Sequence, residues 1–234
     1  MSADTQSTAQ PSAKDAERFV KIPQALPGQE YKAPKNFQNP LMSKHFAKWL
    51  SRYARYEGRY RAILKENGLP EDTVFLAMIE SGFGNFAYSR ARAVGPWQFI
   101  SGTGRLFGLK QDFWVDERRD PEKSARAAAR YLKALYAEFG DWRLAWAGYN
   151  AGEGKVLRGM GYYHTSDYWR LRETRALKRE TRNYVPMIHA AILVAKAPQK
   201  AEASLPTPWP TRSWLASQRL PSRWLSILAT MSAC

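Results

Sequence analysis

The sequence contains very little cysteine and histidine. The single cysteine of the 234-residue chain is its last residue, Cys234, so this chain can form neither an internal disulfide nor a cysteine-based metal site. The three histidines, His45, His164 and His189, lie far apart along the sequence. Zinc ligands usually come in closely spaced groups, so this spacing argues against a zinc site. We therefore expect no bound metal.

Long hydrophobic runs, strand patterns and targeting signals are also missing. No apolar run reaches the roughly 18 residues that a membrane-spanning helix needs, and no charged segment followed by an apolar one marks a signal peptide at the N-terminus. No stretch shows the alternation of apolar and polar residues that a β-strand requires. Apolar residues spaced as in helices predict a mainly α fold instead.

Positive charge is abundant, with a formal net charge of +15. Such a charge favours a polyanionic partner, which could be nucleic acid, anionic lipid or an acidic wall polymer. The sequence contains no zinc-finger spacing, RNP motif or phosphate-binding glycine loop, and its basic residues are spread along the chain. We therefore expect no nucleic-acid partner. Hydrophobic residues make up 44% of the chain, enough for a packed core and too many for global disorder.

The chain divides into three parts by composition. Residues 1–40 are rich in Ser, Ala, Gln, Pro and Lys and are expected to be a disordered leader. Residues 41–197 carry the helical periodicity, and 198–234 form a basic tail rich in Pro and Trp whose role is unknown. Within the middle part, the spacing predicts helices over 41–68, 71–81, 97–107, 122–139, 142–149 and 180–196, and a loop over 82–95.

Glu80 is the first candidate for chemistry, because it follows the apolar residues Ala77, Met78 and Ile79 at the end of a helix. Burial against such neighbours disfavours the charged carboxylate and raises its pKa. A carboxyl that stays protonated near neutral pH can donate its proton to a glycosidic oxygen. A solvated helix end is the alternative interpretation.

Glu80 opens a series of short motifs that follow one another in a fixed order. These motifs are Glu80-Ser81-Gly82-Phe83, then Gly95-Pro96-Trp97-Gln98, then Gly148-Tyr149-Asn150-Ala151-Gly152, and finally Glu180-Thr181-Arg182-Asn183-Tyr184-Val185. In this order they resemble the lytic transglycosylases of the soluble-lytic-transglycosylase type, closest to the membrane-bound branch D group. The segment Asp116-Glu117-Arg118-Arg119-Asp120 also resembles that branch, and the resemblance extends over about residues 69–196.

The resemblance implies a goose-lysozyme-like catalytic domain, with a glycan-binding cleft and Glu80 as its single acid and then base. It implies that four further residues line the cleft around Glu80, and that two others contact the sugars; these are Gln98, Tyr149, Asn150 and Tyr184, and Ser89 and Thr103. Amides and hydroxyls can bond sugar groups while aromatic faces meet apolar sugar faces, and Tyr184 could also bond Glu80 and tune its pKa. Core packing is the alternative for both tyrosines. Gly95 and Gly152 are expected to allow particular backbone conformations and not to bind ligand.

The resemblance further implies cleavage of the β-1,4 bond between N-acetylmuramic acid and N-acetylglucosamine, leaving 1,6-anhydro-muramyl ends. No cofactor is needed. The expected partner is the peptidoglycan glycan strand, the expected location is the periplasm or cell envelope or outside the cell, and a monomer is expected. The basic tail could contact a membrane or the wall. Three residues depart from the family pattern and affect the shape of the subsites: Pro96, Ser101 and Gly148.

A second carboxylate would allow hydrolysis instead, because ordinary glycosidases use two. Between Ser81 and Gln111 the sequence has no Asp or Glu, and Asp72 lies about 12 Å from Glu80 along a helix, which is too far. Folding could still bring others close, namely Asp116, Glu117, Asp120, Glu153 and Glu180. The alternatives are therefore a hydrolytic lysozyme on the same fold, a non-catalytic wall-binding module and a basic nucleic-acid binder.

Overall fold

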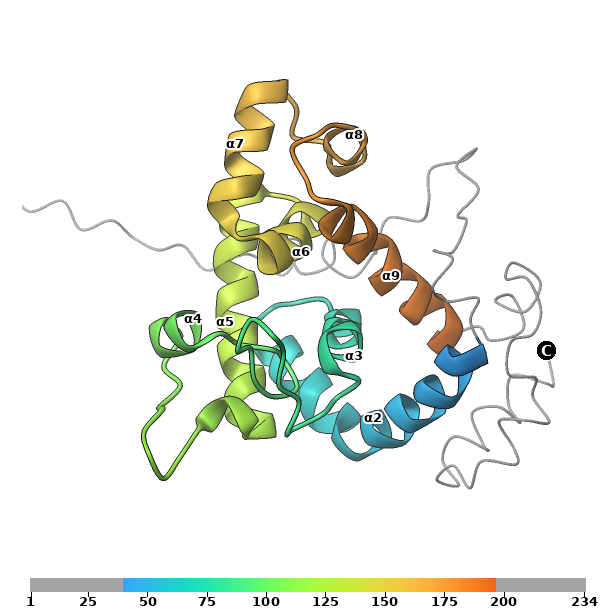
Figure 1. Ribbon diagram of the computed structural model, residues 1–234, viewed down its shortest axis with the longest axis vertical. Coiled ribbons are helices and arrows are strands. Elements are labelled where there is room, and N and C mark those ends of the chain that lie inside the picture. The colour runs from blue at the N-terminus through green and yellow to red at the C-terminus, as the bar shows by residue number, and fades with distance from the viewer. Residues whose placement is uncertain (1–39, 197–234) are drawn as a thin grey trace, which may run out of the picture.

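The computed structural model describes residues 40–196, so the expected leader and the basic tail lie outside the described part of the chain. Within it the fold is mainly α, as predicted, with eight α-helices (Figure 1). The helices are α2 (Pro40–Glu66), α3 (Val74–Ser81), α4 (Ser101–Leu106), α5 (Pro121–Phe139), α6 (Trp142–Ala151), α7 (Glu153–Tyr163), α8 (Tyr168–Glu173) and α9 (Arg179–Lys196), with short 3-10 turns at Glu71–Thr73 and Glu117–Arg119.

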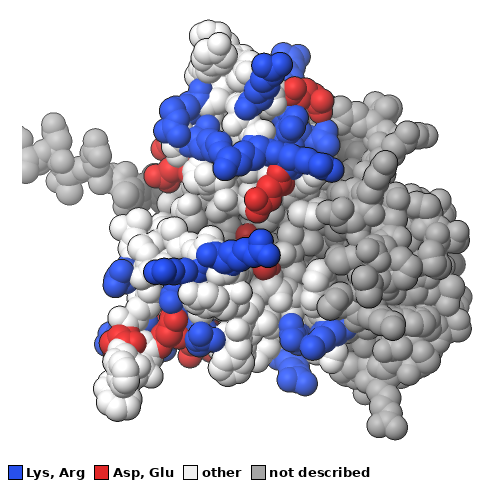
Figure 2. Space-filling model, in the orientation of Figure 1, with Lys and Arg blue, Asp and Glu red and all other residues white. Residues whose placement is uncertain are grey.

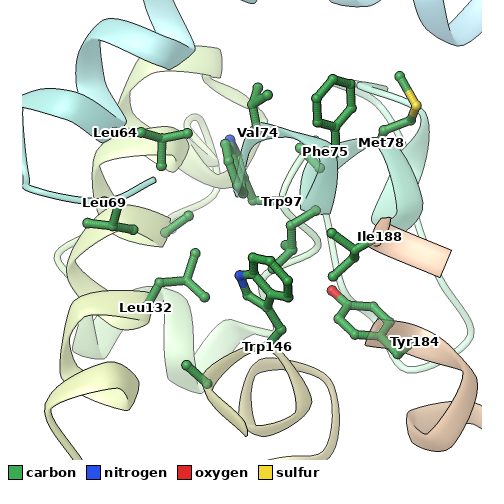
Figure 3. Packing of buried hydrophobic residues seen from close by; sticks show 14 of the residues in the cluster. Leu64, Leu69, Val74, Phe75, Met78, Trp97, Leu132, Trp146, Tyr184 and Ile188 are labelled. Atoms are coloured by element: carbon green, nitrogen blue, oxygen red, sulfur yellow. The ribbon is translucent and has the colours of Figure 1, made fainter. Parts of the chain in front are cut away.

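The short helix α3 is the centre of the arrangement. Residues Val74 to Met78 of α3 are all buried, because α3 packs between α2 and α9. On the other side of the core, α5 contacts both α2 and α6, and α6 contacts α9. Figure 3 shows Trp97 and Trp146 in the middle of this core, with Tyr184 at its edge and the tyrosine oxygen turned inward.

The sequence encodes the start of the long helix α5, its end, and the start of α6 through local capping residues. The carboxylate of Asp120 accepts a bond from the backbone N–H of Lys123 at 2.8 Å and caps the start of α5. Gly140 ends α5 with a φ of +67°, a left-handed conformation that suits glycine. Asp141 then caps α6 by accepting from the N–H groups of Arg143 and Leu144. The glycine and the aspartate therefore define where α5 ends and α6 begins.

Three details of the helix prediction were wrong. The helix expected to begin at Trp97 begins at Ser101, because Trp97 is fully buried, Gln98 has a φ of +51°, and Phe99 pairs with Val94 in an antiparallel bridge. The sequence analysis also did not predict α7 and α8. Helix α7 contains three glycines and buries only Val156 and Gly159, so its apolar periodicity is too weak to indicate a helix.

The 82–100 segment between α3 and α4 contains no helix and is held in place by Arg118. The Arg118 guanidinium pairs with Asp116 at 2.8 Å and donates to the carbonyl oxygens of Phe99 at 3.1 Å and Arg92 at 3.3 Å. The Arg118 carbonyl also packs directly against Gly95, which has a φ of +83°. Gly95 is therefore needed for its backbone conformation and for this close approach, as predicted.

Among the residues 40–196, no helix is long and apolar enough to cross a membrane.

We predict that Gly95→Ala destabilises the protein by about 3 kcal/mol or more, since the new methyl would lie 1.8 Å from the Arg118 carbonyl oxygen in a strained left-handed backbone. Gly161→Ala is the matched control, because nothing lies within 4 Å of its added methyl, and alanine favours the helix by about 0.5–1 kcal/mol. Urea unfolding measures both. Equal stability of the two variants would contradict this account of the Gly95 contact.

Candidate active site

Glu80 lies in the last turn of α3, where the helix is ended by a left-handed glycine. Gly82 has a φ of +58°, and the N–H groups of Gly82 and Phe83 bond back to the carbonyls of Met78 and Ala77, a helix end that favours glycine. A Cβ atom on Gly82 would lie 2.0 Å from the Trp49 ring. The glycine therefore allows α2 to approach the end of α3 closely.

Ser81 ties this end of α3 to the Gly95–Gln98 motif. Its hydroxyl donates to the carbonyl oxygen of Pro96 at 2.8 Å and accepts from the N–H of Gly84 at 3.0 Å. Two motifs that are separated in the sequence therefore lie side by side next to Glu80. The sequence analysis quoted Ser81 within its motif but gave it no role.

Tyr184 of α9 donates a hydrogen bond to Oε1 of Glu80 at 2.5 Å, across 104 residues of sequence. Burial raises the pKa of Glu80 from its ordinary range to about 7. The Tyr184 bond acts in the opposite direction and lowers this pKa, because it stabilises the charged carboxylate, while the negative charge of Glu180 raises it. Near neutral pH Glu80 can therefore both give and take a proton.

Tyr149 of α6 is also close enough to Glu80 for the charge of that carboxyl to act on it. Its hydroxyl donates to the carbonyl oxygen of Trp97 at 2.7 Å. Burial and the nearby charge of Glu80 hold the pKa of Tyr149 well above its ordinary value, and burial and Glu80 do the same for Tyr184. Both hydroxyls therefore keep their protons. The two rings also pack in or against the core, so core packing and a place at the site are compatible.

The side-chain amide of Gln98 is partly occupied by hydrogen bonds within the protein. Its Nε2 donates to the carbonyl oxygens of Gly95 at 2.8 Å and of Ala87 at 3.5 Å, while its backbone has a φ of +51°. The amide nitrogen thus braces the loop that holds Trp97, whose carbonyl accepts from Tyr149. Only the amide oxygen of Gln98 is left for other contacts.

Asn150 is oriented by a residue that the sequence analysis did not assign. The Thr181 hydroxyl donates to Oδ1 of Asn150 at 2.8 Å, which leaves the amide NH₂ as the donor end of the side chain. Thr181 is buried and precedes Tyr184 on α9. The Asn150 motif and the Tyr184 motif are therefore linked directly.

Within residues 40–196, no side-chain hydrogen bond links Ser89 or Thr103 to the residues described above. The Ser89 hydroxyl accepts from the N–H of Ala93 at 3.1 Å and closes a turn of its own loop. Thr103 lies half-buried on α4. Gly152 has a φ of +86° and separates α6 from α7. Its role is therefore to allow this backbone conformation, as predicted.

Most of the candidate second carboxylates have other partners. Asp116 pairs with Arg118, Glu117 pairs with Lys123 at 2.6 Å, and Asp120 caps α5. Glu153 and Glu180 are exposed, and of these Glu180 is the one whose charge raises the pKa of Glu80. In the described residues, no group of three or more His, Cys, Asp or Glu side chains could hold a metal ion.

Comparison with known proteins gives one family. Residues 60–171 match the model of the transglycosylase SLT domain. Over 149 residues, the chain is 38% identical to membrane-bound lytic murein transglycosylase D of Escherichia coli, covering 62% of this chain and 32% of that protein. It is also 31% identical over 151 residues to a peptidoglycan transglycosylase of Escherichia phage T7, covering 63% of this chain and 11% of that protein.

A solved structure agrees with these matches. The lytic transglycosylase Slt of Pseudomonas aeruginosa aligns with a TM-score of 0.50 and 26% identity, over 61% of this chain and 24% of that one. The chain thus spans about a third or less of the length of each of these relatives. Residues 60–171 match the transglycosylase SLT domain, and the fold and the sequence motifs of this region agree with that match.

Proposed function

We propose that this chain is a peptidoglycan lytic transglycosylase in which Glu80 acts first as general acid and then as general base. The observation that carries the proposal is the Glu80 carboxyl itself. Its pKa is raised to about 7 and Tyr184 bonds it at 2.5 Å, so both protonation states are accessible at neutral pH. A single carboxyl that can both donate and accept a proton suffices for a reaction that needs neither water nor metal.

In the first step, protonated Glu80 donates its proton to the oxygen of the β-1,4 bond that follows N-acetylmuramic acid. That bond breaks, and the N-acetylglucosamine side leaves with the proton as a free hydroxyl. The N-acetyl oxygen of the muramic acid residue assists at C1 and stabilises the developing positive charge. Glu80 is left as a carboxylate, which the Tyr184 bond stabilises.

In the second step, charged Glu80 takes the proton from the C6 hydroxyl of the same muramic acid residue. The C6 oxygen attacks C1 and closes the 1,6-anhydro ring as the N-acetyl oxygen withdraws. Glu80 returns to its protonated form, so proton and electrons balance within one turnover. The pKa near 7 suits both transfers, because the group must lose and regain its proton at similar cost.

The other candidate residues have supporting roles in this proposal. Tyr184 and Tyr149 flank Glu80 with hydroxyls that stay protonated. The NH₂ group of Asn150 is the donor for an N-acetyl or hydroxyl oxygen, and the amide oxygen of Gln98 is an acceptor for a sugar hydroxyl. Ser89 and Thr103 contact sugars farther along a glycan-binding cleft. Residues 41–197 form the catalytic domain, flanked by the leader and the basic tail.

The proposal extends to place and partner. The glycan strand of peptidoglycan is the substrate, and no cofactor and no nucleic acid take part. The protein acts as a monomer in the periplasm or cell envelope, or after secretion. The names of the relatives support this, since they describe murein and peptidoglycan transglycosylases. The basic tail, 198–234, is a candidate for contact with the wall or a membrane surface.

Hydrolysis is the second candidate, and the charge of Glu180 is the observation that favours it. Glu180 is the carboxylate whose charge raises the pKa of Glu80, so a water molecule between the two groups could be activated. The product would then be a reducing sugar. Transglycosylation remains the better supported reaction, because it needs no second carboxyl and the names of the relatives describe transglycosylases.

The products distinguish the two reactions. We expect the wild type and Glu180→Gln to release anhydro-muramyl ends from purified peptidoglycan, while Glu80→Gln loses at least about a hundredfold in rate, since the amide cannot donate the proton. Mass spectrometry of the digested sugars identifies the ends. Reducing ends that disappear in Glu180→Gln would instead establish the lysozyme reaction.

The pH profile provides a second prediction. Activity requires protonated Glu80 in the free enzyme, so it should fall as the pH rises through about 7. Tyr184→Phe removes a bond to the charged form, so it should move this fall to higher pH. Glu180→Gln removes a repulsive negative charge, so it should move the fall to lower pH. Rates measured on peptidoglycan between about pH 5 and pH 9 locate this fall in each variant. Shifts of the two variants in the same direction would contradict this assignment of charges.

A further inference from the structure

Positively charged side chains gather beside the proposed site in a group that we call the cationic band. Figure 2 shows Lys and Arg concentrated over α7, α8 and the start of α9. The members of the band are Arg170, Arg175, Lys178, Arg179 and Arg182, of which the first four are exposed and the last is half-buried. None of the five forms an ion pair with a side chain in the part of the chain that the structure describes.

The band is fixed in position relative to Glu80. The carbonyl oxygen of Arg182 accepts from Nε of Arg172 at 2.9 Å and from the Tyr168 hydroxyl at 3.1 Å, which locks the start of α9 to α8. On the same turn of α9, Thr181 bonds Asn150 and Tyr184 bonds Glu80. The helix that supplies the band therefore also supplies the partner of the catalytic carboxyl.

Other exposed cations belong to the segments that follow the Glu80 helix in the sequence. Arg90 and Arg92 on the 82–100 segment and Arg105 on α4 are all exposed. Figure 2 shows a further patch of Lys and Arg apart from the one over α7, α8 and α9, with acidic side chains between the two. The acidic groups close to the band are few: Glu173 pairs with Arg172, Asp167 caps α8, and Glu180 is exposed at the site.

Unpaired cations in such number repel one another, so a bound polyanion would stabilise them. The sugar rings of a glycan strand, with their hydroxyl and N-acetyl groups, carry no charge for them to meet. The carboxylates of peptidoglycan are on the stem peptides, which hang from the lactyl groups of muramic acid, the same sugar that would lie at Glu80. A glycan strand with muramic acid at Glu80 would therefore bring stem-peptide carboxylates to the side of the molecule that carries the band.

We propose that the cationic band binds the carboxylates of the stem peptides attached to the glycan strand at Glu80, and so selects peptide-bearing over bare glycan. This inference rests on the proposed function for its substrate. In this proposal, cations within residues 170–182 recognise the charge of the peptide, and Glu80 carries out the cleavage.

The test measures binding, not cleavage, so that the two proposals can fail separately. Full-length protein carrying Glu80→Gln is sedimented with sacculi that have been stripped of phosphate-bearing polymers. The band variant adds Arg175→Gln, Lys178→Gln and Arg179→Gln. The matched control adds Lys48→Gln, Lys65→Gln and Lys133→Gln, which remove the same charge from exposed sites on α2 and α5. Equal thermal midpoints of the two variants verify that both fold.

We expect the band variant to bind native sacculi about tenfold more weakly, because each exposed ion pair contributes little and three act together, while the control changes less than about twofold. On sacculi whose stem-peptide carboxylates have been amidated, the parent protein should bind as weakly as the band variant. Equal weakening of band variant and control, or parent binding that survives amidation, would overturn the proposal. Charge-dependent binding without any cleavage by the unmutated chain would leave this inference standing and remove the proposed function.

Discussion

The arrangement of the site depends on enclosing one carboxyl group at the end of a buried helix. Val74 to Met78 anchor α3 in the core, and the glycine turn after Ser81 stops the helix just past Glu80. A charged carboxylate in that position would lose hydration, so its protonated form is favoured and its pKa rises to about 7. Tyr184 keeps the charged form accessible through its hydrogen bond. Burial and that bond together produce a group able to exchange a proton near neutral pH.

The surrounding structure can be understood as support for this carboxyl. Ser81 joins α3 to the Gly95–Gln98 loop, and Arg118 holds the same loop from the other side. Tyr149 bonds the carbonyl of Trp97 at the centre of that loop. Each contact uses a backbone carbonyl as acceptor, so the loop is fixed by its main chain. Side-chain groups such as the NH₂ of Asn150 remain as donors.

The start of α9 serves two purposes at once. One side of this turn faces the site, with Thr181 and Tyr184 bonded to Asn150 and Glu80. The exposed positions around it carry Lys178, Arg179 and the acidic Glu180. The charge of Glu180 adds to the effect of burial in raising the pKa of Glu80, whereas the cations produce a positive surface nearby. Under the two proposals above, α9 therefore supplies both the hydrogen-bond partner of Glu80 and cations that would attract an acidic substrate.

The sequence by itself determined the mainly helical class, and its motifs predicted Glu80 and Tyr184 as residues of one site. These are local properties, or follow from the order of the motifs: apolar periodicity marks helices, and a carboxyl after an apolar run is conspicuous. Only the tertiary structure decided which polar groups are already engaged. Gln98 braces its own loop, Ser89 closes a turn, and Thr181 and Arg118 orient their neighbours. Such bonds depend on backbone conformation and on approaches between distant segments, which residue spacing does not encode.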